Sequence, residues 1–283
     1  MSDEREQFLA AWRARSPGAP REFDAATLAA ADARPAIRAA VAIVSMGNAA
    51  EAHSSAMAPD IDDRTGIHVS TRVADATGAR YLGHCPYATD RLDGLAQVWS
   101  PVCLPVAEFL HRTGRFLRDT LAHAPGVQQL WLISGHGGNG AIEPHLAALA
   151  DELGVARVRY ELALRVPPGL PELSTQHAGD LEHSVARALG PGAFDLARFD
   201  ALNQRLAVDL EGVLVDEPAL GGMAGYYLFG DARFDRVRAR YPGVKPSVAQ
   251  LVTRRAIVAD AAIGHAVLDH TVAALAAELL AAA

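Results

Sequence analysis

Apolar runs of strand length alternate with longer segments of helical period, and this alternation constrains the fold more than any other feature of the chain. Three runs rich in β-branched or aromatic residues predict strands: Ala40–Met46, Gln129–Ile133 and Ala156–Leu162. Four segments have helical period: Val106–Ala122, Ile142–Leu153, Leu181–Leu189 and Ile257–Ala282. Strands and helices that alternate in this way form mainly parallel sheets with helices on both faces. The sequence therefore predicts an α/β fold with a mainly parallel central sheet.

Length, charge and cysteine content limit the classes of protein that fit. The 283 residues, half of them hydrophobic, suffice for one large α/β domain, which we expect over residues 39–283 after an N-terminal helical extension over residues 1–38. The net charge of −7 is spread without a basic block, which disfavours nucleic acid or an anionic membrane as partner. The charged N-terminus and the lack of about 18 consecutive apolar residues favour a cytoplasmic protein. We expect reduced cysteines and a small-molecule partner.

Side chains able to bind metals gather at three places in the sequence. The first follows the first predicted strand and contains Glu51, His53 and three nearby aspartates. The second, Ser134–Gly140 (SGHGGNG), follows the next strand and places His136 among four glycines, which allow close approach of the backbone to a ligand. The third, Gln176–Ser184 (QHAGDLEHS), precedes a predicted helix. Because ligands bind at the carboxyl ends of parallel strands, we expect the three segments to meet at one rim of the sheet.

These residue types suit a pair of divalent ions. Imidazole and carboxylate bind zinc, manganese and iron, and one carboxylate can bridge two ions. Such ions lower the pKa of a bound water toward neutrality and so provide hydroxide for attack on a carbonyl. Each motif alone also has a simpler explanation, because E-x-H occurs by chance, an aspartate-rich turn is usually solvated, and GHGGN can be a glycine turn around a hydrogen-bonded histidine.

The order and spacing of the motifs resemble the creatininase (creatinine amidohydrolase) family. That family has E-Q-H-G-P-H-L-P-x-x-x-D after its first strand, N-G-H-G-G-N after a later strand and H-A-G-E-x-E-T-S at the start of a helix. Here Glu51-Ala52-His53 matches the first motif, with Asp62 eleven residues after the glutamate, and Ser134–Asn139 and His177–Ser184 match the others. The resemblance implies a three-layer α/β/α sandwich, two divalent metal ions (zinc, manganese or iron) and a homo-oligomer, with hexamers among the family's assemblies.

Carried over residue by residue, the resemblance implies a set of metal ligands: Glu51, His53, Asp62, His136 and Glu182. Asp62 is implied to bridge the two ions, and Asp60 and Asp63 stay alternatives because the loop departs from the family at five positions. Gly138 stands where creatinine hydrolases have a carboxylate, so Glu182 is predicted to supply the missing oxygen.

Further residues are implied to act on the substrate. His177 is implied to carry the proton from the attacking water to the leaving nitrogen. Chemistry, and not the resemblance, predicts that Asn139 and the nearby glycine amides steady the oxyanion. His183 remains open between a sixth ligand, a second proton carrier and a packed side chain. Tyr81–Trp99 is expected to be a loop beside the pocket. The predicted substrate contacts are His84, Tyr87, Gly137, Gly138 and His183.

The predicted function is hydrolysis of a C–N bond in a cyclic amide, a formamide or a similar small nitrogenous compound by a metal-bridging hydroxide. Ser54–Ala58 (SSAMA) replaces the family's G-P-H-L-P, so we expect a different choice of substrate. Three alternatives stay open. The same site could act on a ring ketone or a peptide terminus, a di-iron centre could use oxygen, or the chain could bind a ligand without turnover.

Overall fold

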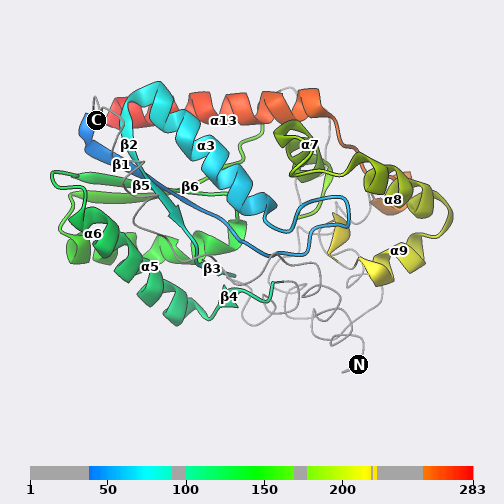
Figure 1. Cartoon of the computed structure of the whole chain (residues 1–283), viewed down its shortest axis with the longest axis horizontal. Helices are drawn as coiled ribbons and strands as arrows, with labels where there is room; N and C mark the ends of the chain where they lie inside the picture. Colours follow the sequence, from blue (N-terminus) through cyan, green and yellow to red (C-terminus); the bar gives the residue numbers. More distant parts are fainter. Residues whose placement is uncertain (1–37, 91–99, 169–176, 218, 222–250, 283) are drawn as a thin grey trace. The chain divides into compact units, whose positions relative to one another are not determined.

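The computed structural model describes residues 38–90, 100–168, 177–217, 219–221 and 251–282 (Figure 1). Two compact units divide the chain. The sheet unit comprises Ser16–Glu51, Asp60–Val166 and Leu268–Ala283, and the helical unit comprises Met1–Arg15, Ala52–Pro59 and Pro167–Val267, as far as these ranges are described. The predicted N-terminal extension lies outside the described residues except for residue 38, so its separation from one domain over residues 39–283 stays a prediction.

Four parallel strands in the order β2-β1-β5-β6 form the centre of the sheet unit. They are β1 (Arg38–Met46), β2 (Ala79–Cys85), β5 (Gln129–Ser134) and β6 (Arg157–Leu162). A second parallel pair joins β3 (Ala88–Thr89) to β4 (Cys103–Leu104). The three predicted strands and the parallel sheet are confirmed. The loop prediction for Tyr81–Trp99 is wrong for Tyr81–Cys85, which belongs to β2, and residues 91–99 lie outside the described part.

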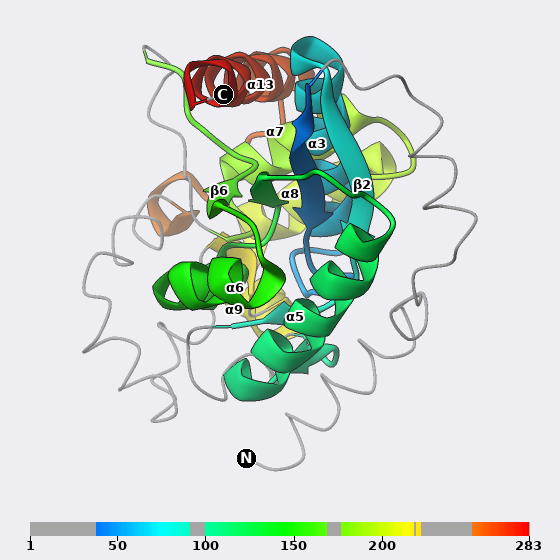
Figure 2. The same cartoon turned by 90° about the vertical axis from the view of Figure 1, so that its left-hand side faces the viewer.

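Helices cover both faces of this sheet. Figure 2 shows α3 (Ile61–Thr77) and α13 (Ala261–Ala282) over one face, and α5 (Val106–Ala122) and α6 (Leu146–Leu153) over the other. The three-layer α/β/α arrangement is therefore confirmed. The predicted helix over Ile142–Leu153 begins instead with η1, a 3₁₀ helix over Gly137–His145.

The α5 and α6 layer is held to the sheet by apolar burial. Leu130 and Leu132 of β5 share one core cluster with Phe109 and Leu117 of α5 and with Leu149 of α6. Each such side chain contributes roughly 1.5–3 kcal/mol when it is fully buried. β5, the strand that ends at the second motif, is therefore anchored in the hydrophobic core.

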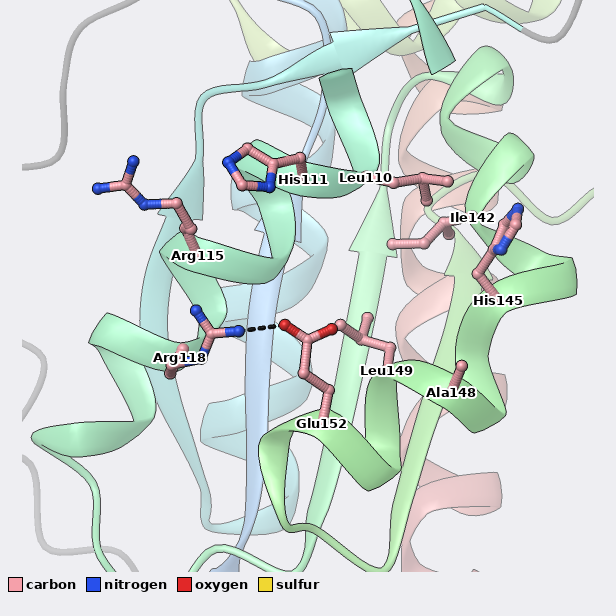
Figure 3. Close-up of a pocket in the computed structure, with 9 residues that line it drawn as sticks. All are labelled: Leu110, His111, Arg115, Arg118, Ile142, His145, Ala148, Leu149 and Glu152. Carbon is pink, nitrogen blue, oxygen red and sulfur yellow. Dashed lines mark hydrogen bonds and ion pairs between the residues drawn. The ribbon is translucent and has the colours of Figure 1, made fainter. Parts of the chain in front are cut away.

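A surface hollow of about 350 Å³ lies between α5 and α6 (Figure 3). Leu110, Ile142 and Leu149 line its apolar part, and the ion pair of Arg118 with Glu152 crosses it. Both partners of this pair are exposed, so the pair contributes about 1 kcal/mol or less. None of the site residues predicted from the sequence lines this hollow.

One described helix, α13, is long and apolar enough by length and composition to cross a membrane. Its residues from Leu268 onward belong to the sheet unit. There Asp269 pairs with Arg72 of α3 at 2.7 Å, and Glu278 pairs with Arg165 at 2.5 Å. These contacts are typical of a helix that covers a sheet.

The helical unit contains α7 (Asp180–Leu189), α8 (Leu196–Val208) and α9 (Leu210–Asp216), labelled in Figure 1. Side chains of Asp195 and Asp209 cap α8 and α9 by accepting backbone hydrogen bonds of 3.0 Å each. The segment Ala52–Pro59 belongs to this unit, and its Met57 forms an antiparallel bridge with Phe194. The predicted helix over Leu181–Leu189 is confirmed as α7.

Candidate metal centre

Close backbone contacts seat the first turn of α3 at the ends of β1 and β5. A Cβ atom on Gly135 would lie 2.0 Å from the carbonyl oxygen of Asp62, and one on Gly66 would lie 2.2 Å from that of Met46. A Cβ atom on Gly47 would lie 2.5 Å from the backbone nitrogen of Asp63. Only glycine fits such approaches without a shift of the backbone. These glycines bring Asp62 to the rim where β1 and β5 end.

Glu51, Asp62 and His136 meet in the sheet unit. The Nδ1 atom of His136 lies 2.7 Å from Oε2 of Glu51 and 3.1 Å from Oδ2 of Asp62. All three residues are buried, and their ligand atoms lie within 4.8 Å of one another. The structure thus brings together three of the five predicted ligands, from β1's exit, α3 and β5's exit.

The electrostatics of this cluster favour a cation. Burial alone lowers the pKa of His136, but the charge of Glu51 and the hydrogen bond to Asp62 outweigh burial and hold that pKa well above its usual range. Nε2 of His136 donates to the carbonyl oxygen of Thr89 at 2.9 Å, so Nδ1 is the atom that can exchange a proton for a metal ion. Two carboxylates and one imidazole are a donor set that zinc, manganese and iron accept, and the site fits such an ion.

Residues that the sequence analysis did not identify support the cluster. Nδ2 of Asn48 donates to Oε2 of Glu51 at 3.2 Å, and Oδ1 of Asn48 accepts from Ser100 at 3.0 Å. Asn48 and Ser100 are fully or almost fully buried. Asn48 directly follows the strand exit, but its contact with Ser100 joins residues far apart in the sequence, which no local pattern reveals.

The three aspartates of the first motif have different neighbours. Asp62 lies against His136, whereas Asp60 pairs with Arg64 at 2.7 Å and Asp63 lies 3.1 Å from Nε2 of His84. Asp62 is therefore the one of the three that the structure brings to the cluster. The expectation of a loop here is wrong for Asp62 and Asp63, which lie in the first turn of α3.

The contact of His84 and Tyr87 with a substrate stays a prediction. His84 is held within the sheet unit, because its Nδ1 lies 3.0 Å from Oγ of Ser45 and its Nε2 faces Asp63. Tyr87 carries the guanidinium group of Arg112 over its ring at 5.9 Å.

The second motif has no room for a side chain at Gly138. A Cβ atom on Gly138 would lie 2.4 Å from Nε2 of His136 and 2.5 Å from the carbonyl oxygen of Thr89, whereas one on Gly137 would meet nothing within 4 Å. A carboxylate side chain at Gly138 is thus incompatible with the observed position of His136.

Asn139 is fully buried, and its amide joins three strand exits. Oδ1 accepts from the backbone of Thr89 at 3.0 Å, and Nδ2 donates to Gly47 at 2.9 Å and to Ser134 at 3.2 Å. Through these contacts Asn139 connects the ends of β1, β3 and β5. Its predicted contact with an oxyanion is untested.

The helical unit assembles the other predicted ligands. Nε2 of His53 lies 3.7 Å from Oε2 of Glu182, and the rings of His53 and His177 are 4.3 Å apart. Nε2 of His177 donates to the carbonyl oxygen of Ala52 at 2.7 Å, and Glu182 accepts from the backbone of Ala178 at 2.6 Å. Residues from the first and third motifs therefore lie together in this unit.

His183 is fully buried in the helical unit. Its ring lies 5.7 Å from that of Phe199 and 6.5 Å from that of Phe194. Burial lowers the pKa of His183 to about 4, so its imidazole is neutral near pH 7. Of the three alternatives for His183, a packed side chain matches these contacts.

This chain is similar to known proteins in sequence and in structure. No protein-family model matches the chain. The 2-amino-5-formylamino-6-ribosylaminopyrimidin-4(3H)-one 5'-monophosphate deformylase of Methanobrevibacter ruminantium is 24% identical over 196 residues, which cover 68% of this chain and 71% of that relative.

Solved structures of creatininases are also similar. A mutant creatininase described as Type II has 25% identity and a TM-score of 0.46, over 59% of this chain and 72% of that chain. A creatinine amidohydrolase (creatininase) has 23% identity and a TM-score of 0.45, over 62% of this chain and 71% of that chain. The deformylase and the creatininases are thus proteins to which this chain is similar.

Proposed function

We propose that this protein is a metal-dependent amidohydrolase that hydrolyses a C–N bond other than a peptide bond. The buried cluster of Glu51, Asp62 and His136 at the carboxyl ends of parallel strands is the observation that carries the proposal. Two carboxylates beside one imidazole favour positive charge at this place and supply the donors that a divalent ion requires. The deformylase relative is named for a formylamino compound, so a formamide is the first substrate class, and a cyclic amide the second.

We further propose that two ions bind. Glu51, Asp62 and His136 would hold one ion, and His53 and Glu182 would hold the other, while the bridging role of Asp62 stays a prediction. The 3.7 Å separation of His53 from Glu182 supports the second pair of ligands. When bound, such ions supply Lewis acidity and lower the pKa of water.

His177 would move the proton. Because its Nε2 donates to the carbonyl oxygen of Ala52, Nδ1 is the atom that would accept a proton from the attacking water and return it to the leaving nitrogen. The backbone contact fixes the tautomer and the orientation of the ring. General acid–base catalysis of this kind contributes roughly 10²–10⁴-fold in rate.

Metal analysis and formate release test the proposal on the full chain. Protein purified with zinc, manganese or iron should contain about two ions per chain and release formate from a formamide or open a cyclic amide. His136→Ala should lose at least one ion, whereas His145→Ala, a change at an exposed histidine of η1, should keep both. Wild-type protein that stays metal-free with all three metals in excess would exclude the proposed chemistry.

A coloured iron form that consumes oxygen would move the reaction from hydrolysis to di-iron oxidation. Metal binding without turnover of formamides, hydantoins, lactams or creatinine would favour another bond or a binding role. We also propose a cytoplasmic homo-oligomer that acts on a small molecule. Light scattering on the purified protein tests the assembly, and localisation of a tagged chain tests the compartment.

A further inference from the structure

Contacts between Ala52–Ser54 and His177–His183 join the first and third motifs within the helical unit. His177 donates to the carbonyl oxygen of Ala52, His53 faces Glu182 at 3.7 Å, and Oγ of Ser54 lies 2.9 Å from Nε2 of His183. The last two contacts are consecutive, because Ser54 follows His53 and His183 follows Glu182. The Ser54–His183 hydrogen bond therefore adjoins both proposed ligands of the second ion.

The direction of this hydrogen bond follows from the other ring nitrogen. Nδ1 of His183 lies 2.8 Å from the carbonyl oxygen of Gly179, which can only accept. The single ring proton of a neutral imidazole is then on Nδ1, and Nε2 accepts from the hydroxyl of Ser54. The same hydroxyl oxygen accepts from the backbone of Ala56 at 3.2 Å. Ser54 is 8% exposed, so both contacts are shielded from solvent.

The remainder of the segment is anchored separately. The backbone and hydroxyl of Ser55 donate to Glu217 at 2.8 Å and 2.6 Å. Ala58 donates to the carbonyl oxygen of Ala193 at 2.9 Å, and Asp195 donates to that of Ala56 at 2.8 Å. These contacts hold the segment to residues after α7, whereas the Ser54–His183 contact links it to α7, the helix that carries Glu182.

We propose that His183 is a positioning residue that acts through Ser54 to hold His53 opposite Glu182 and so sets the affinity of these two ligands for a divalent ion. The inference rests on the proposed function, because it takes His53 and Glu182 as ligands. It assigns His183 a role other than ligand or proton carrier. Contacts that orient ligands typically change metal affinity 10–100-fold when they are lost.

Zinc titration of chelator-treated full-length protein by calorimetry tests this role. Ser54→Ala should lower the affinity for one of two zinc ions about tenfold and leave the affinity for the other within about threefold of the wild type. His183→Asn keeps a donor near Nδ1 but loses the acceptor at Nε2, so it should have the same effect. The double variant should be no weaker than either single one, because both remove the same contact. His183→Gln, which places an acceptor near Nε2, should restore most of the affinity.

Ser55→Ala is the matched control, since it loosens the same segment at its Glu217 anchor. If it weakens the ion as much as Ser54→Ala does, general anchoring of the segment explains the effect and the positioning role is wrong. Two ions bound unchanged by Ser54→Ala would overturn this inference and leave the proposed function intact. A wild-type chain that binds no ion overturns both. Circular dichroism identifies a His183→Asn protein that fails to fold, and Ser54→Ala then decides.

Discussion

We expect His183, the buried histidine of α7, to make the stability of the protein depend on pH. The pKa of His183 is about 4 in the folded protein, against an ordinary value of 6.5, because burial disfavours the charged ring. A group with a lowered folded pKa binds its proton more readily in the unfolded chain. Its full contribution to stability is present above pH 6.5 and is lost as the pH falls from 6.5 toward 4. A shift of this size corresponds to about 3 kcal/mol, of which about 2 kcal/mol is lost between pH 7 and pH 5.

Urea unfolding followed by circular dichroism at pH 7 and pH 5, with a chelator present, measures this loss. His183→Gln lacks the titrating ring, so its free energy of unfolding should fall about 2 kcal/mol less than that of the wild type over this range. The comparison cancels the other histidines, because both proteins contain them. Equal pH dependence of the two proteins would refute the reasoning and show that the ring of His183 is hydrated in the native state.

Three further outcomes are expected. Gly138→Ala should remove at least the ion that His136 would hold and cost roughly 1–3 kcal/mol or more of stability, because its Cβ atom would meet His136. Gly137→Ala should keep metal binding and stability, and calorimetry and urea unfolding measure the two effects. Asp62→Asn should remove at least one ion from metal analysis, and Asp60→Asn should remove none. Burial raises the pKa of Cys85 to about 12, so iodoacetamide at pH 8 should leave this thiol unmodified in the native protein and label it in urea, as mass spectrometry shows.

The elements predicted correctly are those whose apolar pattern is long and regular. β1 and β5 are continuous apolar runs because both faces of the sheet are covered, and α5 keeps an apolar stripe on one side. In α3 the buried positions include Thr65, Gly66 and Ser70, so the helical period is hidden among polar and small residues. β2 was missed because Arg80, Gly83 and His84 interrupt the apolar residues of its sequence, ARYLGHC.

The candidate site also contains residues that the sequence indicated and residues that it did not. Residue type and position after a strand indicated Glu51 and His136, because metal ligands are limited to a few side chains and strand exits are recognisable, whereas Asp62 was implied by the family resemblance. The neighbours that orient them, such as Asn48 and Thr89, act through contacts between distant segments and are common residue types without a pattern. Their identification required the fold.

Packing around Gly138 limits which side chain this position can carry. Nε2 of His136 and the carbonyl oxygen of Thr89 lie where a side chain at position 138 would begin, so this chain cannot place a carboxylate there with His136 in its observed position. The hydrogen bond between these two groups also fixes Nδ1 of His136 toward Glu51 and Asp62. The second ion of the proposed function would take its oxygen ligand from elsewhere, and the carboxylate of Glu182, 3.7 Å from His53, has the chemistry to provide it. Glu182→Gln should therefore weaken the same ion that Ser54→Ala weakens. If Glu182→Gln instead lowers the affinity for the other ion, Glu182 does not share an ion with His53.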